Sequence, residues 1–410
     1  MALINGTNAY SRSDGNSSHG QNTITHYYNT AGIKAANAKA VYAQWADKHS
    51  MPLKHGLTYK ISKWLHIYDR APTDAEFGAK GYLSSRGIAD VTADLNAVAI
   101  AEGATTGNKQ TIQKITIETS FARYGEILPY TDEVEMFSED YVQVRYREEL
   151  GALANQRFED LIQRDMLGTT NVMYAGTATS NLTLGANVAA DGSEDNDFRV
   201  SYDLIRKGVR KLVRNRAPKS KGILVGSDKV GTMPVPQAYY AIIGAEVKYD
   251  LERVTRGTGN VEEFAYIPFH KYGTVDKAAQ GEVGAMGDVR FIESESAMVY
   301  HGEGAKVPAG YAGTLATTTL SSADASRLGN GYTAGDEHFD AFPILFPTEG
   351  SFATVGLKGQ GKIKFNAQSP SKIELGNPFG TNGFFSYNMW YAGLIIREER
   401  LLKMMVLASA

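Results

Sequence analysis

Two strand-like segments separated by a long interval constrain the fold of this chain more than any other feature. The first is residues 57–68 (LTYKISKWLHIY) and the second is residues 111–121 (TIQKITIETSF). Loops longer than about 12–15 residues are uncommon in compact domains, and an isolated two-stranded hairpin is only marginally stable in water. Neither segment has a core of its own nearby in the sequence. We therefore expect an extended hairpin that lies on another surface, most simply on a second copy of the chain.

The composition excludes several classes of protein. The chain has 410 residues, 43% of them hydrophobic, which suits one large domain or two or three smaller ones. A net charge of -3 and a pI near 6.3 disfavour a dedicated nucleic-acid binder. The absence of cysteine excludes disulfides, thiolate metal sites and cysteine nucleophiles. We find no signal peptide and no stretch near the ~18 apolar residues of a membrane helix, so we expect synthesis in the cytoplasm.

The N-terminal part of the chain precedes the first strand-like segment. Residues 1–22 are rich in Ser, Gly and Asn and are expected to form a flexible arm. Residues 30–48 have apolar residues at three- and four-residue steps, among them Val41 and Trp45, and predict a helix. Residues 70–108, between the two strand-like segments, have no sustained period, although residues 97–101 fit a short strand or turn.

A long helix is predicted after the second strand-like segment. Ser138 can cap it, Glu139 and Asp140 suit its first turn, and Gly168 is a plausible end. Such a helix would be about 45 Å long, as in a structural strut. Its apolar stripe comprises Val142, Tyr146, Leu150, Leu153, Phe158, Leu161 and Ile162.

The second half of the chain mixes helix and strand patterns. A second helix is predicted to start after Ser201 and to run through Val213 toward Pro218. Residues 239–250 carry both helical and strand signals. Residues 300–338 are rich in Gly, Thr, Ser and Ala and predict an inserted surface loop. Strands are predicted at residues 222–226, 283–292, 342–346, 354–365 and 384–396.

The segment from Gly356 to Lys362 resembles a phosphate-binding loop. Ile363 stands where such a loop has the Ser or Thr that binds magnesium, and the following residues have a strand pattern instead of a helix. We therefore interpret the segment as a tight hairpin turn with basic residues. A nucleotide-binding enzyme that uses Gly356–Lys362 is the alternative.

The sequence provides no catalytic, metal-binding or cofactor-binding constellation. None of the eight histidines is paired at the i, i+4 spacing of a helical zinc site, and no G-x-S-x-G motif occurs. Acidic pairs such as Glu148 and Glu149 lie on the polar face of the predicted long helix, where carboxylates are usually solvated or paired with arginines. We therefore expect a protein that is not an enzyme.

One basic cluster repeats every four residues along the predicted second helix. A solvated helix face is the simplest interpretation. The alternatives are contact with an acidic patch on another subunit, or weak sequence-independent contact with DNA. The cluster includes Arg206, Lys207, Arg210, Lys211 and Arg214.

The order of these parts resembles the major capsid proteins of tailed phages of the Hong Kong 97 type. It is similar in particular to those of the short-tailed N-four-like phages, the schitoviruses. The segments that carry the resemblance are residues 128–134 (LPYTDEV), 168–176, 281–293 and 383–397. The inserted loop at residues 300–338 has no counterpart in that family, and we find no motif for covalent cross-linking between subunits.

The resemblance implies an α+β Hong Kong 97-like fold. Its parts would be an N-terminal arm (1–56), an extended loop (57–130), a spine helix with the peripheral domain (131–221), an axial domain (222–346) and a return to the peripheral domain (347–410). The arm is too short for the large scaffolding domain of some relatives, which implies a separate scaffold or none.

The resemblance also implies a function. The chain would self-assemble into hexamers and pentamers of an icosahedral head that encloses double-stranded DNA, with portal, scaffold and decoration proteins as partners. It would be a virion protein assembled in the host bacterial cytoplasm, without cofactors and without a membrane partner. A surface-layer or tail protein is a further alternative. The extended-loop residues expected to contact a neighbouring subunit are Tyr59, Trp64, Tyr68, Arg70, Phe77, Tyr82, Arg86 and Arg123.

Overall fold

The computed structural model describes most of the chain after residue 40. The described residues are 41–64, 88–100, 102–103, 114–137, 142–220, 237–255, 265–266, 279, 281–358, 363–373 and 377–410. All of them belong to one structural unit, Ala38–Ala410. No helix among them is long and apolar enough to cross a membrane.

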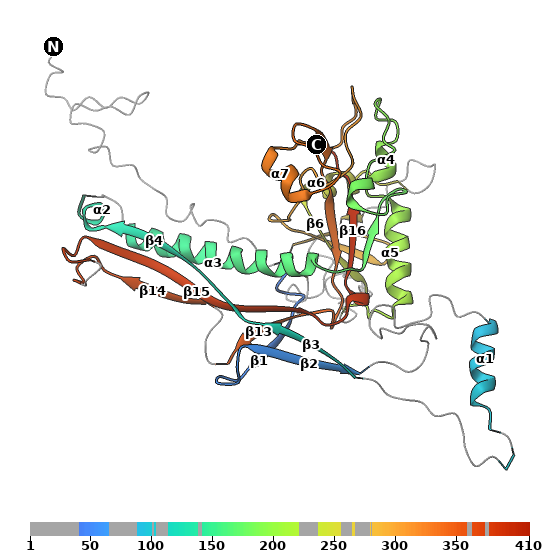
Figure 1. The fold of residues 1–410 in the computed structure, drawn as a ribbon, viewed down its shortest axis with the longest axis horizontal. Coiled ribbons are helices and arrows are strands. Elements are labelled where there is room, and N and C mark those ends of the chain that lie inside the picture. Colours follow the sequence, from blue (N-terminus) through green and yellow to red (C-terminus); the bar gives the residue numbers. More distant parts are fainter. Residues whose placement is uncertain are drawn as a thin grey trace, which may run out of the picture. The chain divides into compact units, whose positions relative to one another are not determined.

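A seven-stranded mixed sheet forms one part of this unit (Figure 1). Every residue of β6 and β12 is buried, as expected for apolar runs such as YYAII and FPILF when both faces of a sheet are covered. The strand order is β5 (Val172–Tyr174), β16 (Leu402–Val406), β12 (Phe342–Phe346), β6 (Tyr239–Ile243), β9 (Val289–Glu293), β8 (Glu282–Met286) and β7 (Ala265–Tyr266).

Helix α5 (Tyr202–Arg214) packs on this sheet through its apolar face, which includes Leu204 and Leu212. The Ser201 side chain accepts a hydrogen bond from the Leu204 amide and caps the helix, as predicted. Gly208 lies against Met404 of β16 so closely that a Cβ would overlap the methionine methyl group. The remaining short helices of this part are α4 (Asp195–Phe198), α6 (Ala245–Leu251) and α7 (Ser322–Leu328).

The second part is a sheet built around β15 (Asn382–Ile395). It pairs antiparallel with β4 (Ala122–Thr131), with β14 (Ile363–Gln368) and with β13 (Phe352–Leu357). The fifth strand, β1 (Asp47–Met51), runs parallel to β13. Residues 347–410, predicted as a return to one domain, contribute to both sheets. They contain β13, β14 and β15 of this sheet, and β16 of the seven-stranded sheet.

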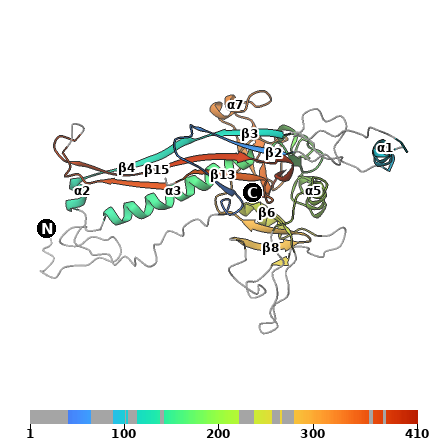
Figure 2. The same ribbon diagram turned by 90° about the horizontal axis from the view of Figure 1, so that it is seen from below.

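Helix α3 (Val142–Leu167) covers one face of the β15 sheet (Figures 1 and 2). Its 26 residues span roughly 39 Å and end just before Gly168, which confirms the predicted long helix. Leu150 and Ala154 pack against alternate residues of β15, including Phe385 and Tyr387. Leu153, which the predicted stripe included, is exposed instead. Ser138 lies outside the described residues, so its capping role remains a prediction.

The strands β2 (Thr58–Trp64) and β3 (Lys114–Ser120) form a separate two-stranded antiparallel ribbon, which we call the ribbon. This confirms the strand assignment of the described parts of both opening segments. Helix α1 (Ile88–Val98) lies in the sequence between the two strands. We predicted no sustained periodic element there, and that prediction was wrong. Helix α2 (Asp132–Phe137) follows β4.

Residues 41–48 were predicted as the end of a helix, and this was wrong for the described part. Val41 and Tyr42 are buried in a turn, and β1 begins at Asp47. The buried carboxylate of Glu159 on α3 accepts hydrogen bonds from the amides of Tyr42 (2.7 Å) and Ala43 (3.3 Å). A distant acceptor thus replaces the hydrogen bonds of a helix, and the local pattern cannot reveal it.

Two other predictions in the second half need correction. Residues 283–292 form a hairpin of β8 and β9 with Gly287 in its turn (φ 58°), not one strand. Residues 300–338 are not a surface insertion, because they contain β10 (Thr317–Thr319), α7 and β11 (Glu337–Phe339), and they bury Leu315 and Leu320. Residues 239–250 contain both β6 and α6, in agreement with their mixed pattern. Residues 222–226 lie outside the described part.

Candidate assembly surfaces

The inner face of the ribbon rests on the chain's own body. Side chains alternate along both strands, and those of one face are half-buried. From this face Lys63 donates a hydrogen bond through Nζ to the Ile396 carbonyl (3.0 Å), and Thr119 donates one through Oγ1 to the Gly393 carbonyl (2.9 Å). The half-buried residues are Tyr59, Ile61, Lys63, Ile115, Ile117 and Thr119.

The base of the ribbon is part of a small core. Phe121, which directly follows β3, is buried with Val355 of β13 and Ala392 of β15. Tyr59 packs against the same cluster and lies 6.2 Å from the His49 ring. As expected, the two segments have no core nearby in the sequence. The expectation that a second copy covers the hairpin was wrong at its base, because strands of the same chain that are distant in sequence supply a core there.

The outer face of the ribbon is exposed. Trp64 is 59% exposed, and the Lys114 Nζ lies 5.8 Å from its ring centroid. Lys60 and Glu118 form an exposed ion pair (2.8 Å), and the hydrogen bond from Lys60 lowers the pKa of the Glu118 carboxyl. Surface pairs of this kind contribute little to stability. The outer face is thus mostly polar, with one large aromatic side chain.

The other predicted contact residues of the extended loop are placed as follows. Arg123 lies on β4, and its guanidinium carbon is 5.8 Å from the Trp390 ring of the same chain. The remaining ones, Tyr68, Arg70, Phe77, Tyr82 and Arg86, lie outside the described residues.

A second exposed surface is the face of the β15 sheet opposite α3. Trp390 pairs with Arg123, Ser386 pairs with Ile127, and directly paired residues share one face of a sheet. Ile127 is 68% exposed, whereas Trp390 is half-buried. We did not single out this face from the sequence, although the alternation of β15 (FFSYNMWY) could have indicated it, because polar residues alternate there with the buried ones.

A third surface lies at the start of β15. The buried Asn377 side chain donates hydrogen bonds to the carbonyls of Pro370, Lys372 and Asn382 and accepts from the amides of Thr381 and Asn382. The loop that it braces exposes Phe379, which is 88% exposed. Sequence reasoning missed this site, because nothing in the local sequence shows that Asn377 is buried.

The basic cluster on α5 does not form one uniform face. Lys207 pairs with Asp203 (2.7 Å), and Arg206 lies 3.9 Å from Asp288. Lys211 is turned inward, where it donates to the Val172 carbonyl (3.1 Å), and burial lowers its pKa. Arg210 and Arg214 are exposed and have no ion-pair partner among the described residues. Two arginines therefore remain available for an acidic partner.

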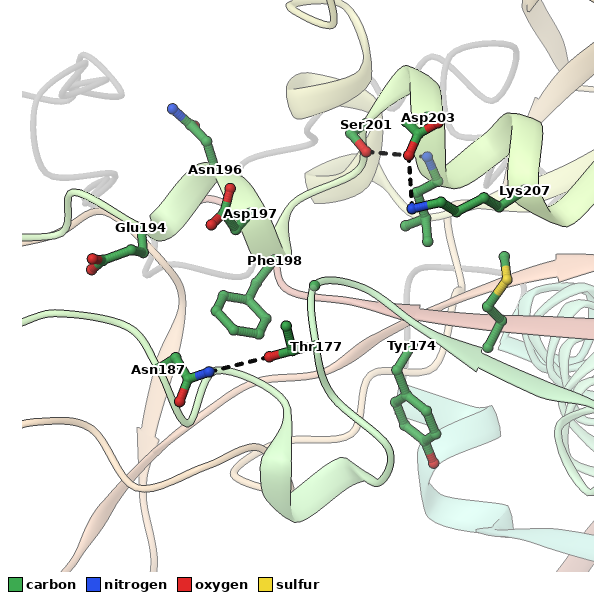
Figure 3. A pocket seen from close by; sticks show the side chains of 13 residues that line it. Tyr174, Thr177, Asn187, Glu194, Asn196, Asp197, Phe198, Ser201, Asp203 and Lys207 are labelled. Carbon is green, nitrogen blue, oxygen red and sulfur yellow. Dashed lines mark hydrogen bonds and ion pairs between the residues drawn. The ribbon is translucent and has the colours of Figure 1, made fainter.

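A cavity of about 380 Å³ lies beside the start of α5 (Figure 3). Its lining is polar and includes the acids Glu194, Asp197 and Asp203. The side chains pair with each other: Asn187 donates to the Thr177 hydroxyl (3.1 Å), and Lys207 binds Asp203. The described residues contain no group of three or more side chains that could hold a metal ion. The lining also contains no histidine or cysteine that could serve as a catalytic base or nucleophile.

The segment from Gly356 to Lys362 does not lead into a helix. Strand β14 begins at Ile363, so no helix N-terminus is available to hold phosphates, which contradicts the nucleotide-loop alternative. The predicted tight hairpin was also wrong. Because β13 and β14 both pair antiparallel with β15, they run in the same direction, whereas the two strands of a hairpin run in opposite directions. Residues 359–362 themselves lie outside the described part.

Comparison with known proteins gives a sequence match over nearly the whole chain. The chain is 25% identical over 399 residues to the major capsid protein of Pseudomonas phage KPP21, and the match covers 93% of this chain and 92% of that protein. No protein-family model matches the chain.

Comparison with solved structures finds phage capsid proteins. The chain in the capsid asymmetric unit of cyanophage Pam1 has a TM-score of 0.50 and 12% identity, covering 94% of this chain and 97% of that one. A chain of the cyanophage P-SCSP1u capsid has a TM-score of 0.48 and 9% identity, covering 94% and 93%. The Pam1 likeness shows a shared mixed fold of helices and sheets. Together with the KPP21 sequence match, it supports a protein of the phage head shell.

Proposed function

We propose that this chain is the major capsid protein of a tailed phage of the Hong Kong 97 type, of the kind found in schitoviruses. The observation that carries the proposal is the 25% identity to the KPP21 major capsid protein across nearly the full length of both chains. Copies of the chain form hexamers and pentamers of an icosahedral head around double-stranded DNA. The protein is a structural component of the virion and has no catalytic role.

The distribution of exposed apolar side chains supports self-assembly. The two sheets bury their own cores, whereas Trp64, Ile127 and Phe379 remain exposed on three separate surfaces. Covering these side chains with another copy of the chain would remove apolar surface from water, which favours association. Three different surfaces suit heterologous contacts, in which one surface of a copy binds a different surface of the next copy. Such contacts close into rings.

The layout of the subunit follows from this proposal. The β15 sheet with α3 corresponds to the peripheral domain, the seven-stranded sheet to the axial domain, and the ribbon with α1 to the extended loop. Without cysteines, shell strength depends on buried interface area, which should exceed the ~1,600 Å² of an ordinary pairwise complex. Portal, scaffold and decoration proteins are the further partners, and assembly takes place in the bacterial cytoplasm.

Weak contact with packaged DNA is part of the same proposal. A net charge of -3 allows the chain to line a DNA-filled shell without condensing on the genome. Arg210 and Arg214 are the exposed basic groups of α5 that could contact phosphates or an acidic surface of another subunit. Because phosphate contacts are screened by salt, raising the salt concentration separates the DNA contact from apolar subunit contacts.

Expression of the full chain, alone and with a scaffold protein, tests the proposal. We expect closed, megadalton-scale particles in sedimentation and negative-stain electron microscopy. A well-folded chain that stays monomeric at high concentration in both cases would contradict the proposal. Flat arrays or open tubes would instead favour a surface-layer or tail protein.

A further inference from the structure

Lys63 is the one charged side chain on the half-buried face of the ribbon, which is otherwise apolar apart from the hydroxyls of Tyr59 and Thr119. Its cross-strand partner is Ile115, and its neighbour on the same face of β2 is Ile61. Burial lowers the pKa of the Lys63 amine, and Glu399, Arg397, Glu398 and Arg400 lie around it. Burial of a charged lysine costs solvation energy. Its hydrogen bond to the Ile396 carbonyl and the nearby carboxylates of Glu399 and Glu398 offset part of this cost.

The acceptor of that hydrogen bond belongs to a well-braced segment. The amide of Ile396 donates to the Ser351 carbonyl (2.8 Å). A few residues later, Asn171 and Asn215 both donate to the Glu399 carbonyl, at 3.2 and 2.8 Å. These bonds connect the end of β15 to the residues that follow α3 and α5. The carbonyl that receives Lys63 is therefore held in place by the body of the subunit.

Thr119 provides the second contact, from the other strand of the ribbon. Its hydroxyl donates to the carbonyl of Gly393 on β15. Gly393 lies three residues before Ile396, which directly follows that strand. Each strand thus contributes one side-chain hydrogen bond to the same short segment of backbone. Together with the core at the base of the ribbon, these two contacts hold both strands against the body of the subunit. We call the pair Lys63–Ile396 and Thr119–Gly393 the ribbon anchor.

We propose that the ribbon anchor fixes the ribbon on its own subunit before assembly and thereby presents Trp64 outward as the residue that binds a second copy of this chain. The binding role of Trp64 rests on the proposed function, whereas the anchor itself does not. Neighbouring residues of a strand point to opposite faces, so Lys63 directed inward requires Trp64 directed outward.

The available face of the ribbon determines what a partner can contact. The isoleucines of the inner face are already half-covered by the subunit itself. A second copy therefore meets the outer face, where Trp64 is the one large apolar side chain among Ser, Thr and charged residues. Tryptophan is enriched among residues that dominate binding energy. Holding it in the bound orientation in advance reduces the entropy lost on binding.

The anchor is tested on the full chain at a concentration below assembly, by amide hydrogen exchange of β2 and β3. We expect Lys63→Met to speed exchange of these strands about tenfold, the effect of losing one hydrogen bond of a charged group. Lys60→Met is the matched control, because Lys60 lies on the outer face of the same strand and forms an exposed ion pair with Glu118. Unchanged exchange in Lys63→Met would overturn the anchor.

The outward role of Trp64 is tested with Trp64→Ala in the same exchange measurement and in an assembly assay. We expect the unassembled variant to exchange at the wild-type rate. We expect the yield of particles to fall at least tenfold, because truncating an aromatic residue buried at an interface commonly costs much of the binding energy. Normal assembly, or exchange as fast as in Lys63→Met, would overturn the role of Trp64. If the wild-type chain forms no particles, the proposed function fails, while the exchange measurement still decides whether the anchor exists.

Discussion

The seven-stranded sheet and the ribbon are both β-structure, but their side chains are covered in different ways. In β6 and β12 all residues are buried within the subunit, whereas in β2 and β3 half-buried and exposed residues alternate strictly. The sheet is stabilised by its own core. The ribbon depends on the segment 393–396 for its inner face and leaves its outer face open.

This difference separates two roles within one chain. A region that buries its own apolar side chains folds without a partner, and changes in it alter the stability of the subunit. A region with one open face adds little to subunit stability but can supply contact area to another molecule. Substitutions in the sheet should therefore affect folding, and substitutions on the outer face of the ribbon should affect assembly.

The largest effect is expected in the seven-stranded sheet. Phe346 of β12 is fully buried, so Phe346→Ala should lower the free energy of unfolding by about 3–5 kcal/mol through lost burial and a cavity. Urea unfolding of the unassembled chain measures this. Phe365→Ala is the control, because Phe365 on β14 is mostly exposed. Similar losses of unfolding free energy in both variants would contradict the distinction between covered and open regions.

A smaller effect is expected on the inner face of the ribbon. Ile117 pairs directly with Ile61 and is half-buried, so Ile117→Ala should cost roughly 1–1.5 kcal/mol, less than a fully buried isoleucine. The same urea experiment detects the loss, and Thr116→Ala on the outer face should change little. A loss as large as that of Phe346→Ala would mean that the ribbon is part of the main core.

The smallest effect concerns pH. Burial raises the pKa of Tyr300 from its ordinary value of 10.0 to about 12. The folded chain therefore holds this proton more tightly, and the resulting stabilisation is present below pH 10 and is lost as the pH rises towards 12. Tyr300→Phe removes this proton, so the variant should lose less stability between pH 10 and 12. The difference should be at most about 1 kcal/mol, because solvent screens a partly exposed group.

Thermal unfolding at several pH values between 9 and 12 measures this difference. Tyr300 packs against both main core clusters, so the experiment reports on the region where they meet. An identical pH dependence in wild type and Tyr300→Phe would show that Tyr300 is not buried in solution.

Elements with a strong periodic pattern were predicted correctly from the sequence. Helices α3 and α5 follow from apolar residues at helical spacing, and Ser201 caps α5 as expected. The hairpin of β8 and β9 was missed, although Gly287-Asp288 between two apolar runs is a recognisable turn pattern. Residues 41–48 were mispredicted because the buried Glu159, more than a hundred residues away, replaces the local hydrogen bonds of a helix.

The candidate surfaces were only partly predictable. The basic residues of α5 could be identified from their spacing, but not that Lys211 turns inward to the Val172 carbonyl. The exposed Phe379 depends on the five hydrogen bonds of Asn377, which involve backbone groups between residues 370 and 382. Such networks require the positions of several backbone segments, and a linear pattern does not contain them.

The sequence by itself determined that Lys63 and Trp64 point to opposite faces of a strand, because the side chains of any strand alternate. It did not determine which of the two faces the body of the subunit. That was decided by the contact between Lys63 and Ile396, which are 333 positions apart. Local backbone geometry fixes alternation, whereas only the packing of distant segments decides which face is covered.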